Sequence, residues 1–155
     1  MQSTPAPPLV SSRIFPVDRH ALFSALTDAE TLARWWGPAG FRNAFDRFEP
    51  RGGGAWHFRM YGPDGAEYQM VKRFEEVTPP SRIVLRHLEP PSHAFTMEMD
   101  LAEAEGGTRL TWTMRFDDPA ELEGIRQVLV DANEQNFDRL AAELAADARS
   151  GEVES

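Results

Sequence analysis

Four histidines are the residues most suited to metal binding or proton transfer, and their spacing favours neither role. His20, His57, His87 and His93 never stand three or four residues apart, which is the spacing of a helical zinc site. Alternation along its predicted strand also places His57 opposite to the neighbouring apolar side chains. We therefore predict no metal site and no cofactor, with surface positions as the default for these side chains.

Motifs for acid–base, nucleophilic and phosphate chemistry do not stand out either. Most of the strand carboxylates Asp46, Glu49, Glu67 and Glu98 should be solvated, and no two of them form an assignable acid–base pair. The Gly52-Gly53-Gly54 run neither opens a helix nor precedes a Lys-Ser/Thr pair, so it predicts a tight hairpin. The sequence contains no nucleophile-elbow motif and no cysteine. We assign no catalytic residue.

Amide, aromatic and methionine side chains favour binding instead. Asn133 and Asn136 lie on or beside the apolar stripe of a predicted C-terminal helix. A buried amide without a partner costs about 1–3 kcal/mol, so a ligand, a water or a nearby turn must supply its hydrogen bonds. The Trp35-Trp36-Gly37-Pro38 segment predicts either a buried staple between helices and sheet or an indole at the mouth of a pocket. Methionines on one sheet face would adapt to varied ligands.

The candidate cavity residues combine these groups with the apolar faces of the predicted strands. His87, Tyr68 and the two asparagines would orient the polar end of a ligand, and the others would hold its body. The full set is Trp35, Trp36, Phe58, Met60, Tyr68, Met70, Phe74, Leu85, His87, Phe95, Met97, Met99, Trp112, Met114, Leu129, Asn133 and Asn136.

Composition narrows the partners and the location. The 155-residue chain carries 25 acidic and 16 basic residues, a formal net charge of -9. Such a balance disfavours nucleic acid and anionic membrane surfaces. No apolar run approaches the length of a membrane span, and residues 1–8 lack the features of a signal peptide. Together with the absence of cysteine, this predicts a cytoplasmic protein.

The elements that must position these residues follow from periodicity and from turn chemistry. Apolar residues alternate over residues 55–60, 93–103 and 108–116, and further strands are predicted at 9–17, 43–49, 67–77 and 82–88. Phe45 and Phe48 are out of phase, which predicts a bulge. Asp18 and Thr27-Asp28 cap two short helices, and Asp118 caps a long helix with Pro119 at its first position.

Assembled, the pattern predicts one α+β domain over residues 9–148, between a disordered arm at 1–8 and a disordered tail at 149–155. A sheet with one dry face must be covered, and only the terminal helix is long enough to do so. We therefore expect a curved antiparallel sheet of about seven strands, two short helices after the first strand, and a long C-terminal helix packed across the sheet. Space left beside that helix would form the cavity.

Several segments together resemble homologues of the activator of the heat-shock-protein-90 ATPase. The likeness covers about residues 10–146 and is carried by residues 17–30, 32–38, 50–56, 63–65, 74–84, 107–111 and 136–144. The resemblance implies the START-like, birch-pollen-allergen-like helix-grip fold, whose members mostly bind hydrophobic ligands and in a few cases are cyclases, aromatases or hydrolases. The family has no shared catalytic motif to place on this chain.

Binding of a small hydrophobic or amphipathic ligand, without catalysis, is the function that we predict. A cyclase- or hydrolase-type enzyme and a chaperone-interacting cofactor are the alternatives. The eponymous member contacts the chaperone through a separate N-terminal domain, for which residues 1–8 leave no room, and homodimerisation stays open. The binding prediction requires that the sheet and the final helix leave space for a guest.

Overall fold

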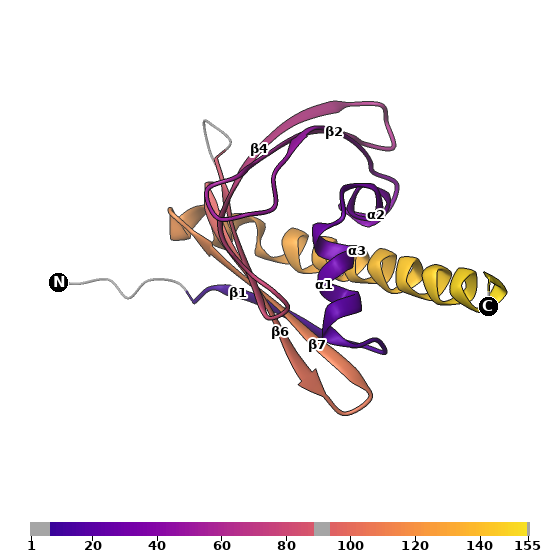
Figure 1. Cartoon of the computed structure of the whole chain (residues 1–155). Helices are drawn as coiled ribbons and strands as arrows, with labels where there is room; N and C mark the ends of the chain where they lie inside the picture. The colour runs from indigo at the N-terminus through magenta and orange to yellow at the C-terminus, as the bar shows by residue number, and fades with distance from the viewer. Residues whose placement is uncertain (1–6, 89–93, 155) are drawn as a thin grey trace.

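The structure, a computed structural model, describes residues 7–88 and 94–154, with side-chain surroundings through residue 146. Its elements follow one another in the predicted order: one strand, two short helices, six strands and one long helix (Figure 1). They are β1 (Leu9–Phe15), α1 (Arg19–Thr27), α2 (Ala29–Trp35), β2 (Arg42–Phe48), β3 (Ala55–Tyr61), β4 (Glu67–Thr78), β5 (Arg82–His87), β6 (Phe95–Ala104), β7 (Gly107–Phe116) and α3 (Pro119–Glu154). Residues 1–6 of the predicted arm at 1–8, the Pro90-Pro91 break and residue 155 lie outside the described residues.

All seven strands form one antiparallel sheet in the order β1-β7-β6-β5-β4-β3-β2. The sheet curls strongly, so that β2, β3 and β4 arch over α2 (Figure 1). The predicted bulge is confirmed, because the register of β2 against β3 shifts between Phe45 and Arg47. A second bulge interrupts β4 between Phe74 and Glu76. Bulges increase local twist, which helps one sheet to wrap around its covering helices.

Three aspartates begin the helices as the sequence predicts. The Asp18 carboxylate accepts a hydrogen bond from Ala21 N at 2.8 Å, and the Asp28 carboxylate accepts one from Thr31 N at 3.0 Å. Asp118 accepts from the backbone N–H of Ala120 at 3.0 Å. Each carboxylate satisfies an amide that has no partner inside the helix.

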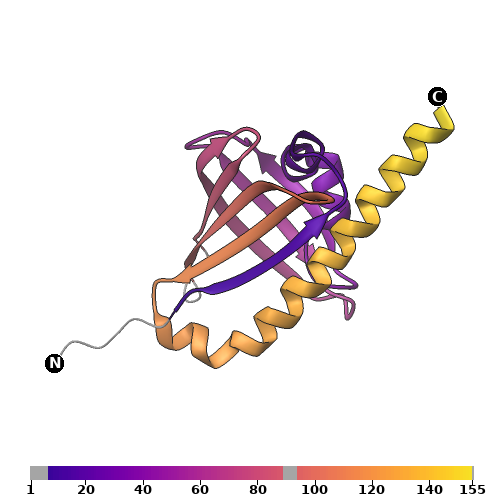
Figure 2. The same ribbon diagram turned by 90° about the horizontal axis from the view of Figure 1, so that it is seen from below.

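The three helices cover the concave face of the sheet between them. Helix α3 packs mainly on β1, β7 and α2, whereas α1 lies against β6 and β7 and α2 against β2. In Figure 2, α3 runs beside β1 and its C-terminal part extends beyond the sheet. This helix continues to Glu154, so the backbone of residues 149–154 is helical where we predicted a disordered tail. Once started, a helix propagates at little cost, and no proline follows to stop it. Among the described helices, none has both the length and the apolar character of a membrane span.

Large aromatic side chains fill the centre of the concave face. Trp36 contacts Trp56 and Trp112, with ring centroids 5.1 and 5.5 Å apart. Trp35 stacks on Trp112 at 6.4 Å and donates its indole N–H to the Ala25 carbonyl at 3.0 Å. Both residues of the Trp35-Trp36 pair are buried, as the staple interpretation predicts. They join α2 to the sheet.

Candidate functional site

Two features of the concave side stand out: a polar contact between α2 and α3, and a buried charge on the sheet. We call the first the clasp, meaning Asn136 and Arg139 of α3 with the backbone of residues 34–38. Asn136 donates from Nδ2 to the Trp35 carbonyl at 3.0 Å and accepts at Oδ1 from Gly37 N at 3.2 Å. A turn therefore satisfies this amide, which was one of the alternatives that the sequence left open.

Arg139 makes most of the clasp. Its Nη1 donates to the carbonyls of Trp36, Gly37 and Pro38 at 3.0, 3.0 and 2.9 Å, and its Nη2 donates to the Arg34 carbonyl at 2.9 Å. Burial lowers the pKa of Arg139, yet a guanidinium stays charged in proteins. Its fixed fork suits four carbonyls that converge from one turn.

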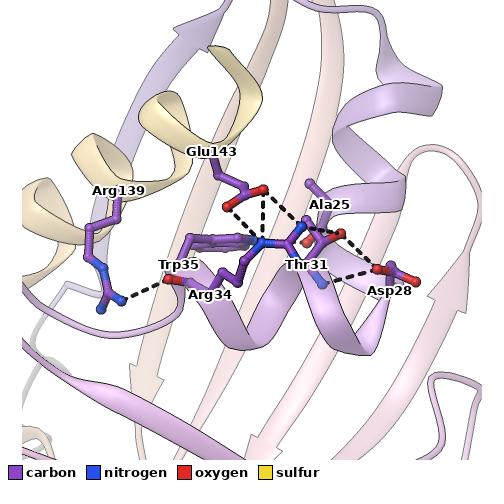
Figure 3. A network of polar contacts seen from close by, with 7 residues as sticks. All are labelled: Ala25, Asp28, Thr31, Arg34, Trp35, Arg139 and Glu143. Carbon is purple, nitrogen blue, oxygen red and sulfur yellow. Dashed lines mark hydrogen bonds and ion pairs between the residues drawn. The ribbon is translucent and has the colours of Figure 1, made fainter. Parts of the chain in front are cut away.

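The outer rim of the clasp is an ion pair between α2 and α3. Figure 3 shows the Arg34 guanidinium between Glu143 of α3 and the first turn of α2. Arg34 Nη2 lies 3.0 Å from Glu143 Oε2 and 3.4 Å from Thr31 Oγ1. The Thr31 hydroxyl donates in turn to the Asp28 carboxylate at 2.7 Å. These contacts hold the start of α2 against α3, and with it the Trp35-Trp36 pair.

The second feature is a row of residues that we call the Lys72 row. Cross-strand pairing joins Trp56 to Lys72, Lys72 to His87, His87 to Phe95, and Phe95 to Phe116. Directly opposite residues share one face of a sheet, so the row crosses five strands, β3 to β7, on the concave side. Lys72 is 4% exposed and His87 is 5% exposed. A cation and an imidazole thus lie on the apolar face.

Aromatic rings surround this cation. Lys72 Nζ lies 3.1 Å from His87 Nδ1, 5.1 Å from the centre of the Phe95 ring and 6.0 Å from that of Trp36. The His87 and Phe95 rings are 4.8 Å apart, and Phe116 continues the stack at 4.9 Å. A charged ammonium can donate to Nδ1 and also be attracted to ring faces. The row therefore offers a positive charge inside an apolar frame.

Packing differs between the centre of the concave face and its edge at the ends of β6 and β7. Trp56, Phe58 and Phe74 are each 1% exposed near its centre. Phe95 and Phe116 at the strand ends, and Leu129 on α3, are only partly buried. Apolar side chains that are partly accessible on the inner side are the ones that a guest could cover.

The predicted cavity residues are placed on the concave side with one partial exception. Buried members are Trp35, Trp36, Phe58, Met60, Phe74, Leu85, His87, Met97, Met99, Trp112, Met114, Asn133 and Asn136. Met70, Phe95 and Leu129 are partly buried, whereas Tyr68 is 46% exposed and only borders the face, near Phe41. Asn133 donates to Ser11 Oγ at 3.0 Å, so this amide also has a protein partner.

Lys72 is the functional candidate that we did not predict. Position 72 lies two residues from both Met70 and Phe74, so it shares the apolar face to which the sequence assigns them. Lys72 is also the only lysine of the chain. Those two signals together could have identified it. Trp56 was not among the predicted cavity residues. Within the described part of the chain, the buried indole N–H groups of Trp56 and Trp112 have no hydrogen-bond acceptor.

The outer surface offers fewer features of a ligand site than the concave face does. Hollows formed by described residues lie beside the β1–α1 turn, along α1 and the start of α2, and between Arg19 and the β5–β6 edge. They are open, and none is lined by a predicted cavity residue. No group of three metal-ligating side chains occurs among the residues that the structure describes.

Comparisons with known proteins give the family. The model of the activator of Hsp90 ATPase homolog 1-like protein family matches residues 16–146, so the chain belongs to that family. None of the curated proteins matches the chain.

Solved structures share the fold. A protein from Nitrosomonas europaea superposes with a TM-score of 0.84 at 20% identity, covering 92% of this chain and 97% of that one. A protein from Rhodobacter sphaeroides gives 0.83 at 24% identity, over 94% and 96% of the two chains. The AHSA1 protein from Silicibacter pomeroyi gives 0.73 at 25% identity, over 90% and 99%. The architecture is therefore the helix-grip fold that the sequence predicts.

Proposed function

We propose that this protein binds a small amphipathic molecule between the concave face of the sheet and α3, and that it does not convert its ligand chemically. The ligand body would lie against Phe95, Phe116 and Leu129. Its polar end would meet Lys72 and His87. The observation that carries the proposal is the buried Lys72–His87 contact at 3.1 Å, in one row with partly accessible aromatic side chains.

Energetics support a binding role for this row. Taking an ammonium out of water is costly, and apolar residues of similar size often replace buried charges without loss of stability. Most of the rest of the concave face is apolar and rich in methionine, so a methionine at position 72 would suit packing alone. A lysine there, and two indole N–H groups that find no acceptor among the described residues, give polar anchors that packing does not require.

Native mass spectrometry of the protein purified from its own host tests the proposal. We expect a co-purified small molecule that dissociates on unfolding. A thermal-shift screen of lipids and aromatic compounds should also yield ligands. A ligand at 100 times its Kd stabilises a protein by about 2.7 kcal/mol, which corresponds to a rise in Tm of roughly 5–10 °C at this chain length. Finding neither a bound molecule nor a stabilising compound would refute the proposal.

Two variants of α3 make the screen specific. Leu129→Trp adds volume where the ligand body would lie and should abolish the thermal shift. Val128→Trp is the matched control, because Val128 is 67% exposed and points away from the sheet. If both variants keep the shift, the ligand binds elsewhere.

A second candidate function is supported by the same pair. An imidazole 3.1 Å from an amine has the composition of an acid–base pair, which the enzyme alternative requires. Mass spectrometric analysis of any co-purified ligand before and after prolonged incubation distinguishes the two functions. Unchanged ligand supports binding alone, and a new product supports catalysis.

A further inference from the structure

We propose that the indole N–H of Trp56 donates a hydrogen bond to the ligand, and that the ligand carries a carbonyl oxygen to accept it, as in a ketone or an ester. The inference rests on the proposed binding function and adds the chemical class of the ligand. It follows from one buried donor, from the rings around that donor and from the strand that covers it.

The Trp56 side chain lies on the concave face with its polar atom unmatched. The residue is 1% exposed, and its indole N–H has no acceptor among the described residues. By contrast, the indole N–H of Trp35 donates to the Ala25 carbonyl at 3.0 Å. Buried donors in native structures almost always have a partner, and leaving one unmatched costs free energy. An acceptor that a ligand brings to Trp56 would recover that free energy.

Aromatic rings surround the Trp56 indole. Trp36, Phe45 and Phe48 lie edge-on to it, with ring centroids 5.1, 5.4 and 5.7 Å from that of Trp56. The Phe58 ring stacks on it at 4.5 Å. A ring face accepts an N–H only weakly, so a carbonyl oxygen that replaces such a contact forms the stronger hydrogen bond.

A carbonyl group fits this apolar frame better than a hydroxyl or a charged group does. A carbonyl oxygen accepts hydrogen bonds and donates none, whereas a hydroxyl brings a hydrogen that needs an acceptor of its own. Burying that hydrogen among rings would leave it poorly matched. A charged head group would also have to give up its hydration. The surroundings of Trp56 therefore favour a ketone or an ester.

Trp56 is also the more reachable of the two unmatched indoles. Trp112, the other one, packs against Phe137, which is 0% exposed. The side chains that lie over Trp56 include Phe45 and Phe48, which are only partly buried. Both belong to β2, which is an edge strand with a bulge. A guest would thus reach Trp56 by displacing side chains at the edge of the sheet.

A matched pair of probes tests the acceptor. Benzophenone and diphenylmethane have the same two phenyl rings, and a carbonyl in the first replaces a methylene in the second. One additional buried hydrogen bond should make the intact protein bind benzophenone at least about 5-fold more tightly. Equilibrium dialysis measures both affinities.

Trp56→Phe removes the N–H and keeps an aromatic ring, so the ratio of the two affinities should fall to about 1. Tyr61→Phe is the matched control, because it removes a polar hydrogen from an aromatic side chain of the same strand on the opposite face. It should leave the ratio unchanged. Equal affinities for the intact protein, or a ratio that Trp56→Phe does not lower, overturn the carbonyl inference and leave the binding function standing. If the intact protein binds neither probe, the binding function fails and this inference fails with it.

A measurement on the unaltered chain covers the case in which Trp56→Phe does not fold. The sequence has four tryptophans, so isotope-labelled protein gives four indole N–H resonances. We expect the Trp56 proton to move downfield when benzophenone binds and to move much less with diphenylmethane. The Trp35 N–H, which already donates to a carbonyl, is the internal reference and should respond alike to both probes. The same response of Trp56 to both probes would contradict the inference.

Discussion

Among the described residues, Arg139 and Lys72 are two cations on the inner side, and the contacts described for them differ in kind. Arg139 gives its hydrogens to four backbone carbonyls of residues 34, 36, 37 and 38. The contacts of Lys72 include an imidazole and two aromatic rings. Backbone carbonyls are fixed by the fold, whereas side chains can reorient around a guest. The difference separates a cation held by the backbone from the one to which we assign a role in the proposed ligand binding.

This contrast also explains the residue types. A guanidinium offers its donors in one plane, which matches the converging carbonyls of a turn. An ammonium can exchange one acceptor for another by rotating about its terminal bond. Substitutions in the clasp should therefore reduce stability, while under the proposed function substitutions at Lys72 should chiefly change ligand binding.

The strongest test of the contrast is Arg139→Met. It removes four hydrogen bonds, and although Asn43 Nδ2 and Phe41 N still donate to the Trp36 and Pro38 carbonyls, we expect the free energy of unfolding to fall by about 3 kcal/mol. Urea denaturation measures the change. The free energy of unfolding of Arg139→Lys, which keeps the charge but not the fork, should lie between that of Arg139→Met and that of the unaltered protein. A loss below about 0.5 kcal/mol would show that the clasp does not maintain the fold.

Gly37→Ala tests the turn that supplies those carbonyls. Gly37 has φ +99, and a Cβ there would lie 2.6 Å from Met60 Cε. We expect a loss of about 2 kcal/mol from strain and crowding. Gly53→Ala is the matched control, because Gly53 has φ +84 with no atom within 4 Å of an added Cβ. It should cost about 1 kcal/mol, and equal losses would mean that the Met60 contact is irrelevant.

Acid should weaken the start of α2, where Thr31 lies beside the Arg34 guanidinium at the rim of the clasp. Hydrogen bonds from the Thr31 hydroxyl and backbone, with a smaller contribution from Arg34, hold the pKa of Asp28 below its ordinary value of 3.8. A lowered folded-state pKa contributes stability that is present above the ordinary value and is lost as the pH falls through the folded value.

Asp28→Ala should therefore cost about 1 kcal/mol at neutral pH through loss of the cap, and the difference from the unaltered protein should shrink below about pH 4. Urea titrations at several pH values measure this. Asp28→Asn retains a capping oxygen without the charge and should show a weaker pH dependence. A difference that stays constant with pH would exclude the charge of Asp28 as its source.

The smallest effect is expected outside, where a third cation forms an ordinary surface pair. Arg86 and Asp117 have side chains that are 22% and 55% exposed. A double-mutant cycle with Arg86→Met and Asp117→Asn should give a coupling of about 0.5 kcal/mol, decreasing with salt. A coupling as large as the Arg139 effect would remove the distinction between fixed inner and solvated outer cations.

Local patterns in the sequence predicted most of the architecture. Alternation identified β3, β6 and β7, capping aspartates identified the helix starts, and an out-of-phase Phe45–Phe48 pair identified a bulge. These features depend on residues close together in the chain, whose preferences act before any long-range contact forms. The end of α3 was misplaced because helix termini without a proline or a cap are weakly encoded.

The candidate site was likewise predictable from local sequence patterns only in part. The two-residue spacing from Met70 and from Phe74 already places position 72 on the dry face, and the sequence shows that Lys72 is the only lysine of the chain. Only strand pairing brings Lys72 to His87 and Phe95, because register depends on which strands become neighbours. Likewise, Asn136 and Arg139 could be placed on one helix, but not opposite the turn at 36–38, about a hundred residues earlier. Short-range chemistry determines faces and ends, and tertiary packing alone decides which side chains of distant segments meet.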